Sequence, residues 1–231
     1  MDNGLMELVC GDFTSDGPIA ILPGSFNPPT VAHVGLAEAA LARVATIVFT
    51  LPRVFPHKSY EGVCQAGRLD LLRELTLRQP RFAVAVTEGG LFVEMAREFS
   101  RFRPAGEVFL LCGRDAAERI LGWDYPESDP LDRQLEEFQL LVAARHGSFL
   151  PPPRLKHRIE SLVTEANWDD VSSTAVRVAI ENGEPWQHLV PEQIHKQVES
   201  AYQRGSEDSI RNRLQRVEAK GQPKSGSIEA R

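Results

Sequence analysis

Two hydrophobic patterns take turns along this chain. Short runs of consecutive apolar, often β-branched residues predict buried strands, whereas longer segments with an apolar residue every three or four positions predict helices. The predicted strands cover residues 19–22, 45–51, 82–87, 107–112 and 138–144. The predicted helices cover residues 32–44, 65–79, 91–102, 115–121, 174–182 and 191–202. Residues 158–165 fit either a helix or a strand.

The alternation of the two patterns predicts the fold class. Strands separated by helices of about 10–15 residues form βαβ units with a mostly parallel sheet. We therefore expect an α/β, Rossmann-like doubly wound fold with helices on both faces of the sheet. Residues 1–203 are predicted to form this domain. Residues 204–231 are polar and poor in aromatic side chains, which predicts a flexible C-terminal tail.

A glycine-containing loop follows the first predicted strand. The loop and the helix start after it have the sequence Gly24-Ser25-Phe26-Asn27-Pro28-Pro29-Thr30-Val31-Ala32-His33. Free N–H groups at a helix start bind anions, and His33 adds a donor beside them. The loop therefore favours a phosphate site, although a simple Gly-Pro turn with an exposed His33 explains the same residues.

A second polar segment precedes the helix predicted near residue 174. It has the sequence Val171-Ser172-Ser173-Thr174-Ala175-Val176-Arg177, in which either serine is a suitable N-cap. Arg177 lies one helical turn after Ser173, so the two side chains share a face. Hydroxyls, free N–H groups and a guanidinium gathered at one helix end suit a phosphate. The alternative is an ordinary serine cap followed by a solvated arginine.

Composition and charge narrow the class of protein. The chain has 231 residues, of which 42% are apolar and 25% are charged, as is typical of a globular domain. The net charge of −6 argues against nucleic acid and anionic membranes as partners. The 3 cysteines are far apart and form no Cys-x-x-Cys pair. We therefore expect no metal site and no disulfide framework, and a reducing, cytoplasmic location.

Together, and in this order, the two phosphate-site candidates resemble motifs of the nucleotidyltransferase superfamily. Within it they resemble nicotinate or nicotinamide mononucleotide adenylyltransferases. Residues 24–28 resemble the family's Gly-(Gly/Ser)-(Thr/Ser)-Phe-(Asp/Asn)-Pro loop, and residues 30–33 resemble its (His/Thr)-x-x-His motif. Residues 171–177 resemble its Ile-Ser-Ser-Thr-x-x-Arg motif, with Val171 in place of isoleucine.

Shorter matches lie between these motifs. Pro56-His57-Lys58 resembles the family's Pro-His-Lys loop. Residues 113–115 and Trp123 resemble its Gly-x-Asp segment and the tryptophan that follows it. Arg145 matches an arginine that some relatives carry near the adenine pocket.

The resemblance implies adenylyl transfer from ATP to nicotinate or nicotinamide mononucleotide. This reaction releases pyrophosphate and forms a dinucleotide in NAD biosynthesis. Mg²⁺ is expected to be carried mainly by the ATP phosphates. A small phosphorylated acceptor is the second substrate, and homo-oligomer formation stays open.

The resemblance also assigns roles to residues. The expected catalytic residues are His33, Arg177 and Lys58. Nucleotide contacts are expected from Gly24, Ser25, Phe26, Thr30, Gly113, Asp115, Ser172, Ser173 and Thr174. Trp123 and Arg145 are the candidates for contacting the acceptor.

The segment after Glu88 departs from the family pattern. Gly89-Gly90-Leu91-Phe92-Val93-Glu94 stands where bacterial relatives carry a Ser-Tyr-Thr-x-Asp-Thr type stretch that helps to hold the nicotinate ring. Two alternatives therefore stay open. One is an adenylyl- or cytidylyltransferase of the same superfamily with another phosphorylated acceptor, and the other is a catalytically lapsed nucleotide-binding regulator.

Overall fold

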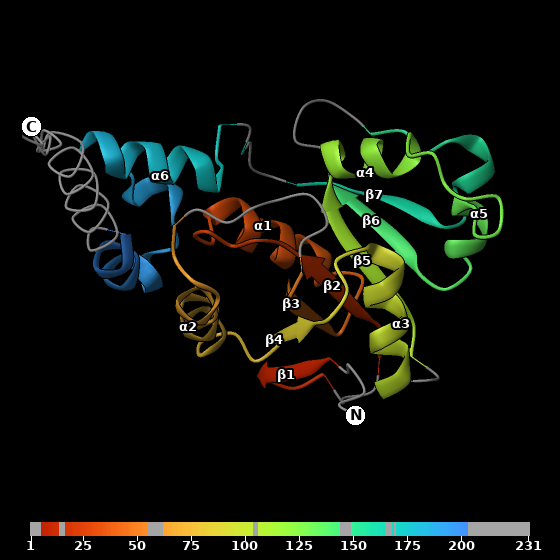
Figure 1. The fold of residues 1–231 in the computed structure, drawn as a ribbon, viewed down its shortest axis with the longest axis horizontal. Coiled ribbons are helices and arrows are strands. Elements are labelled where there is room, and N and C mark those ends of the chain that lie inside the picture. The colour runs from red at the N-terminus through yellow and green to blue at the C-terminus, as the bar shows by residue number, and fades with distance from the viewer. Residues whose placement is uncertain are drawn as a thin grey trace, which may run out of the picture.

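One mixed β-sheet forms the centre of the molecule (Figure 1). The computed structural model describes residues 6–13, 17–54, 62–103, 106–143, 149–164, 168 and 170–202. Within these residues, seven strands lie side by side in the order β1-β4-β3-β2-β5-β6-β7. They are β1 (Glu7–Cys10), β2 (Ile19–Pro23), β3 (Thr46–Pro52), β4 (Phe82–Thr87), β5 (Val108–Gly113), β6 (Gln139–Ala143) and β7 (Ile159–Leu162). Strands β2 to β7 run parallel, and β1 is antiparallel at one edge.

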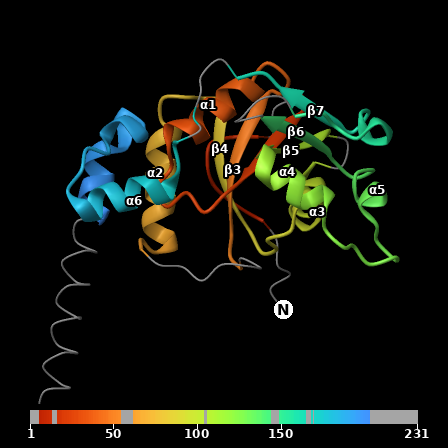
Figure 2. The same cartoon turned by 90° about the horizontal axis from the view of Figure 1, so that it is seen from above.

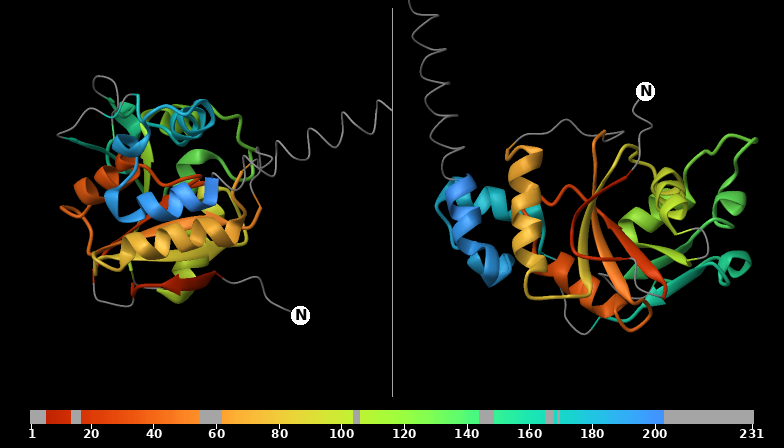
Figure 3. Two further views of the ribbon diagram at one scale, coloured as in Figure 1. Left: turned by 90° about the vertical axis from the view of Figure 1, so that its left-hand side faces the viewer. Right: turned by 90° about the horizontal axis from the view of Figure 1, so that it is seen from below.

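Helices cover both faces of the sheet (Figure 2). They are α1 (Val31–Ala40), α2 (Gln65–Thr76), α3 (Phe92–Phe102), α4 (Arg114–Leu121), α5 (Leu131–Gln134) and α6 (Ser173–Asn182). The first two and α6 share one apolar core, and α3, α4 and α5 share the other. Short 3₁₀ turns cover Pro153–Leu155, Gln187–Leu189 and Glu192–Ile194, and residues 195–202 continue as a helix near α2 (Figure 3). No helix among the described residues has the length and apolar character to cross a bilayer.

Successive side chains of the central strands pack alternately into the two hydrophobic cores. In β3, Ile47 and Phe49 belong to the core that α1 and α2 complete, whereas Val48 belongs to the core on the other face. Successive side chains of a strand point to opposite faces, so a strand covered on both sides must be apolar throughout. This requirement explains why β3 appears in the sequence as an unbroken apolar run.

The predicted α/β class and the mostly parallel sheet are confirmed. The ambiguous segment near residue 160 forms β7. The prediction missed β1 and α5, since each spans 4 residues and β1 is half-buried or exposed, so neither shows a full apolar period. The predicted tail, residues 204–231, lies outside the described residues. So does residue 144, the last residue of the strand predicted over 138–144.

The first helix is shorter than predicted, because α1 ends at Ala40 instead of residue 44. Arg81 donates from Nη2 to the carbonyl oxygens of Leu41 (2.9 Å) and Val44. It also donates from Nε to the oxygen of Ala45 at 2.8 Å. These donors replace the N–H groups that another helical turn would supply, so the chain can leave the helix at this point.

A buried glutamate fixes the loop between β4 and α3. Glu98 of α3 is 6% exposed, and its two carboxylate oxygens accept hydrogen bonds from the N–H groups of Glu88 (3.1 Å) and Gly89 (3.0 Å). At the start of the same helix, Glu94 accepts a hydrogen bond from the N–H of Leu91 at 2.9 Å. Two carboxylates of α3 therefore hold the loop that leads into it.

We expect Glu98→Ala to lower the free energy of unfolding by about 2–3 kcal/mol, because two N–H groups lose an ionised acceptor at a partly buried site. Glu127→Ala, at an exposed position, is the control and should change the stability by less than about 0.5 kcal/mol. Urea unfolding followed by circular dichroism measures both variants. Equal unfolding midpoints for the two would contradict this role of Glu98.

Candidate active site

The carboxyl ends of β2 and β5 meet in the middle of the sheet. Strand β2 pairs with β3 on one side and with β5 on the other. The chain passes from β2 into α1 on one face and from β5 into α4 on the opposite face. The two connections therefore diverge and leave a crevice between them, which is where open α/β sheets bind ligands. Because β2 and β5 run parallel, the loop after β2 and Gly113 at the end of β5 open toward the same edge of the sheet.

The loop after β2 turns tightly around a buried phenylalanine. The N–H of Gly24 donates to the oxygen of Thr50 at 3.1 Å, and a Cβ at Gly24 would come within 2.8 Å of the Phe26 ring. The backbone of Phe26 has φ +44°, in the left-handed region. Its buried ring packs edge-on against the rings of Phe49 and His33. Packing of the ring therefore offsets an unfavourable backbone conformation beside the crevice.

Thr30 and His33 form a reciprocal cap at the start of α1. The Thr30 side chain accepts from the N–H of His33 at 3.4 Å, and the N–H of Thr30 donates to His33 Nδ1 at 3.0 Å. The Thr30 hydroxyl also lies 2.7 Å from this Nδ1 atom. Because Nδ1 accepts a hydrogen bond from a backbone amide, the neutral imidazole carries its proton on Nε2. The cap therefore fixes the ring and decides which nitrogen is the donor.

The start of α6 docks onto the loop after β2. Ser172 caps α6 with its side chain, which leaves the next residues to face the loop. Ser173 Oγ donates to the carbonyl oxygen of Pro28 at 2.7 Å, across 145 positions of sequence. Arg177 Nη1 donates to the carbonyl oxygen of Asn27 at 2.7 Å. The two segments predicted to form phosphate sites are therefore in direct contact.

Two further side chains hold the same loop. Arg68 of α2, which is 3% exposed, donates from Nη1 to the carbonyl oxygen of Ser25 at 2.9 Å. The Tyr202 hydroxyl donates to Asn27 Oδ1 at 2.5 Å, and burial raises the pKa of Tyr202, so that the hydroxyl keeps its proton. Carbonyl and N–H point in opposite directions in a trans peptide, so the N–H of Phe26 points away from Arg68.

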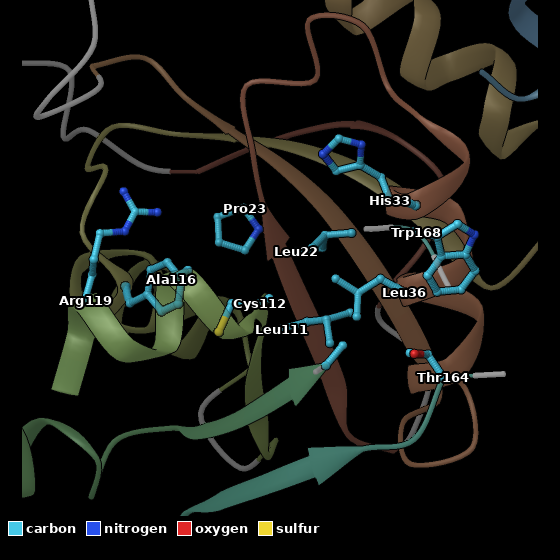
Figure 4. Close-up of a pocket in the computed structure, with 14 residues that line it drawn as sticks. Leu22, Pro23, His33, Leu36, Leu111, Cys112, Ala116, Arg119, Thr164 and Trp168 are labelled. Atoms are coloured by element: carbon cyan, nitrogen blue, oxygen red, sulfur yellow. The ribbon is translucent and has the colours of Figure 1, made fainter. Parts of the chain in front are cut away.

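A cavity of about 260 Å³ lies in the crevice, at the carboxyl ends of the central strands (Figure 4). Its walls come from α1, α3, α4 and the segment between β7 and α6. The residues that line it are Leu22, Pro23, Ala32, His33, Leu36, Phe92, Leu111, Cys112, Gly113, Ala116, Arg119, Ala143, Thr164 and Trp168. Two residues predicted from the sequence, His33 and Gly113, are among them.

Other predicted residues lie at the rim of this region or away from it. Asp115 is exposed in the first turn of α4. Trp123 follows α4, is 58% exposed and does not line the cavity. Lys58 and Arg145 lie outside the described residues.

Trp168 is a cavity residue that the sequence-based prediction missed. Its ring lies against Gly35 of α1, where an added Cβ would come within 2.1 Å of Trp168 Cζ2. In Figure 4 the ring stands beside Leu36, on the same side of the cavity as His33. The signal available in the sequence was an aromatic residue in a polar stretch shortly before Ser172. The prediction also missed Phe92, through which the segment after Glu88 reaches the cavity.

The cysteine that lines the cavity is not a thiolate. Burial raises the pKa of the Cys112 thiol to about 12, although the positive charge of Arg119 acts in the opposite direction. The thiol therefore stays protonated at neutral pH and does not act as a nucleophile. In the described part of the chain, no group of three or more His, Cys, Asp or Glu side chains is arranged to hold a metal ion.

Comparison with known families identifies the protein class. The family model described as cytidylyltransferase-like matches residues 21–179, from β2 through most of α6. The chain belongs to the cytidylyltransferase-like family. It is a nucleotidyltransferase enzyme with the α/β fold of that family, and the matched region contains both segments that meet at the loop after β2.

Curated relatives point to one branch of the nucleotidyltransferases. A relative from Geobacter sulfurreducens is 30% identical over 206 residues, which cover 77% of this chain and 94% of the relative. A relative from Carboxydothermus hydrogenoformans is 25% identical over 191 residues, which cover 77% of this chain and 92% of the relative. Both are described as probable nicotinate-nucleotide adenylyltransferases. This nucleotidyltransferase therefore resembles that branch over most of its length.

Solved structures share the fold. Nicotinic acid mononucleotide adenylyltransferase of Plasmodium falciparum, complexed with NaAD, matches with a TM-score of 0.57 at 16% identity. The match covers 78% of this chain and 96% of that one. A second structure of the Plasmodium protein, complexed with APC, matches with a TM-score of 0.55 at 14% identity. At these identities the likeness establishes a common architecture.

We expect Trp168 to support the base of a nucleotide bound to this transferase. Gly35→Ala should displace the Trp168 ring and weaken ATP binding about fivefold or more, because stacking of a base on an aromatic side chain is worth about 1–3 kcal/mol. Titration with ATP, followed by tryptophan fluorescence and by calorimetry, measures the affinity.

Two variants control this experiment. Gly67→Ala makes the same change inside α2, away from the cavity, and should bind ATP normally. Trp123→Phe should keep the fluorescence response to ATP, whereas Trp168→Phe should lose it. If Gly35→Ala binds ATP with the affinity of the unchanged chain, Trp168 does not support the base.

Proposed function

We propose that this nucleotidyltransferase transfers the adenylyl group of ATP to a pyridine mononucleotide, nicotinate or nicotinamide mononucleotide. The products are the corresponding dinucleotide and pyrophosphate. The observation that carries the proposal is the contact between the two motif segments beside the cavity that His33 lines. The descriptions of the curated relatives support the choice of ATP and of a pyridine acceptor.

The reaction needs positioning more than proton transfer. An oxygen of the acceptor phosphate attacks the α-phosphorus of ATP in line and forms the new phosphoanhydride bond. The bond from the α-phosphorus to the bridging oxygen breaks, and the electron pair leaves with pyrophosphate. Because the attacking phosphate is already anionic, no strong general base is required. The protein must align the two substrates and stabilise the charge that develops on the phosphoryl oxygens.

His33 supplies the central donor in this proposal. Its Nδ1 atom is held by Thr30, so Nε2–H is the atom that donates to a phosphate oxygen of ATP. The N–H of Phe26, which points away from Arg68, and the N–H groups near Gly24 contribute further donors from the same loop. These donors are fixed before the substrate binds, so little reorganisation accompanies the reaction.

The start of α6 serves the outer phosphates of ATP in this proposal. Ser172, Ser173 and Thr174 lie in its first turn, where helix N–H groups favour an anion. Arg177 Nη2 donates to Thr174 Oγ1 at 3.3 Å, so the guanidinium already lies over this turn. Lys58 is a further candidate for the phosphates, and Mg²⁺ enters as part of the MgATP substrate.

The remaining predicted residues are assigned to the ribose of ATP and to the acceptor. In this proposal Gly113 and Asp115, at the start of α4, face the adenosine ribose, whose hydroxyl groups would donate to the carboxylate. Trp123 and Arg145 stay candidates for contacts with the acceptor.

Direct assay tests the proposal. The protein is incubated with MgATP and, separately, with nicotinate and nicotinamide mononucleotide, and the products are identified by mass. We expect a dinucleotide together with one pyrophosphate for each turnover. Phosphopantetheine and sugar phosphates serve as alternative acceptors. Pyrophosphate release with one of these alone would replace the pyridine acceptor, and ATP binding without any release would contradict catalysis.

Replacement of His33 tests its role as donor. We expect His33→Ala to reduce turnover by roughly 10²–10³-fold, the scale for loss of one donor to a transition state. The fold should be retained, as circular dichroism can establish. His188→Ala, at an exposed position that does not line the cavity, is the matched control and should turn over normally. A His33→Ala variant with a normal rate would show that the imidazole takes no part in the reaction.

A further inference from the structure

The cavity has an uneven distribution of charge. Among the described residues that line it there is no carboxylate, and Arg119 contributes a permanent positive charge. In Figure 4 the Arg119 side chain rises from α4, on the side of the cavity opposite His33 and Trp168. The cavity therefore has an imidazole at one side and a guanidinium at the other.

Hydrogen bonding within α4 directs the Arg119 side chain. Its Nε donates to the carbonyl oxygen of Asp115 at 3.2 Å, one turn earlier in the helix. The guanidinium is therefore drawn back toward the N-terminus of α4, and this end of the helix lies at the carboxyl edge of the sheet. The bond occupies Nε and leaves the two terminal nitrogens to face a ligand, as a planar fork that matches a carboxylate.

Within the described part of the chain, Arg119 makes no ion pair, whereas Arg114 on the same helix is paired with Glu118 at 2.6 Å. The positive charge of Arg119 also favours the ionised form of the Cys112 thiol, which lines the same cavity. A cation that faces a cavity whose described lining carries no negative charge favours a ligand that brings one.

We propose that Arg119 selects the acceptor by binding a carboxylate on its ring, so that nicotinate mononucleotide is preferred over nicotinamide mononucleotide. This inference rests on the proposed function. The reacting phosphate must lie near His33, and in a mononucleotide the ring is the end most distant from the phosphate. Phe92, which lines the same cavity from the start of α3, offers that ring an apolar contact.

Substitution of Arg119, on α4, tests the inference. The value of kcat/KM is measured for both mononucleotides at saturating MgATP, in the unchanged chain, in Arg119→Gln and in Arg119→Lys. We expect Arg119→Gln to lower the value for the nicotinate form about tenfold, mainly through KM, because the ring carboxylate loses a charged hydrogen-bond partner. The value for the nicotinamide form, whose ring substituent is an uncharged amide, should change by less than about twofold. Arg119→Lys should retain part of the preference, because it keeps the charge and loses the fork.

Arg114→Gln is the matched control, because it removes the same charge from the same helix at a position that does not line the cavity. It should leave the ratio of the two kcat/KM values unchanged. An equal loss with both acceptors in Arg119→Gln would overturn the inference and place Arg119 on a phosphate instead. If Arg119→Gln leaves the ratio of the two kcat/KM values as it is, the inference is also overturned. The same holds if the chain without substitutions prefers the nicotinamide form. If the unchanged chain forms no dinucleotide with either acceptor, the proposed function itself fails.

Discussion

The backbone of the loop after β2 depends on side chains from later parts of the chain. Its carbonyl groups at Ser25, Asn27 and Pro28 accept hydrogen bonds from Arg68, Arg177 and Ser173, respectively. Residues 28 and 29 are prolines without an N–H group, so the carbonyl of Ser25 finds no donor in a turn or helix of this stretch. The shape of the candidate site is therefore set by the docking of α2 and α6, and it forms only when the whole domain has folded.

This dependence links the position of α6 to the chemistry proposed for His33. Asn27 is held by Arg177 and by the Tyr202 hydroxyl, and the cap at Thr30 follows three residues later. A shift of α6 would move the loop, and with it the cap that orients the imidazole. Arg68 and Tyr202, to which no substrate contact is assigned, therefore contribute to the proposed catalysis through geometry, as expected where reactants must be aligned to within a fraction of an ångström.

The sequence predicted the features that arise from local patterns. The apolar run of β3 and the capping residues Thr30 and Ser172 can be recognised directly in the sequence. The observed strand and helix starts lie close to the predicted positions. The aromatic character of Trp168 is visible in the sequence, but its position in the cavity is not, because that position depends on the absence of a side chain at Gly35, more than a hundred residues earlier. The hydrogen bonds to the three loop carbonyls could not be predicted either, because spacing along the chain does not show which distant donor reaches which acceptor. Hydrogen bonds and packing between distant elements decide these features.

The two halves of the crevice are built in physically different ways. On the side of β2 and α6 the expected ligand contacts combine the side chains of His33 and Arg177 with backbone N–H groups, which any sequence supplies once the loop has its shape. On the side of α3 and α4 the cavity is lined by the side chains of Phe92, Ala116 and Arg119, each of which can change without disturbing the sheet. The phosphate side therefore carries chemistry common to the fold, while the α3–α4 side is free to define the acceptor. The segment after Glu88, which departs from the family pattern, reaches this second side through Phe92, so we expect its altered sequence to affect the choice of acceptor more than the proposed transfer step.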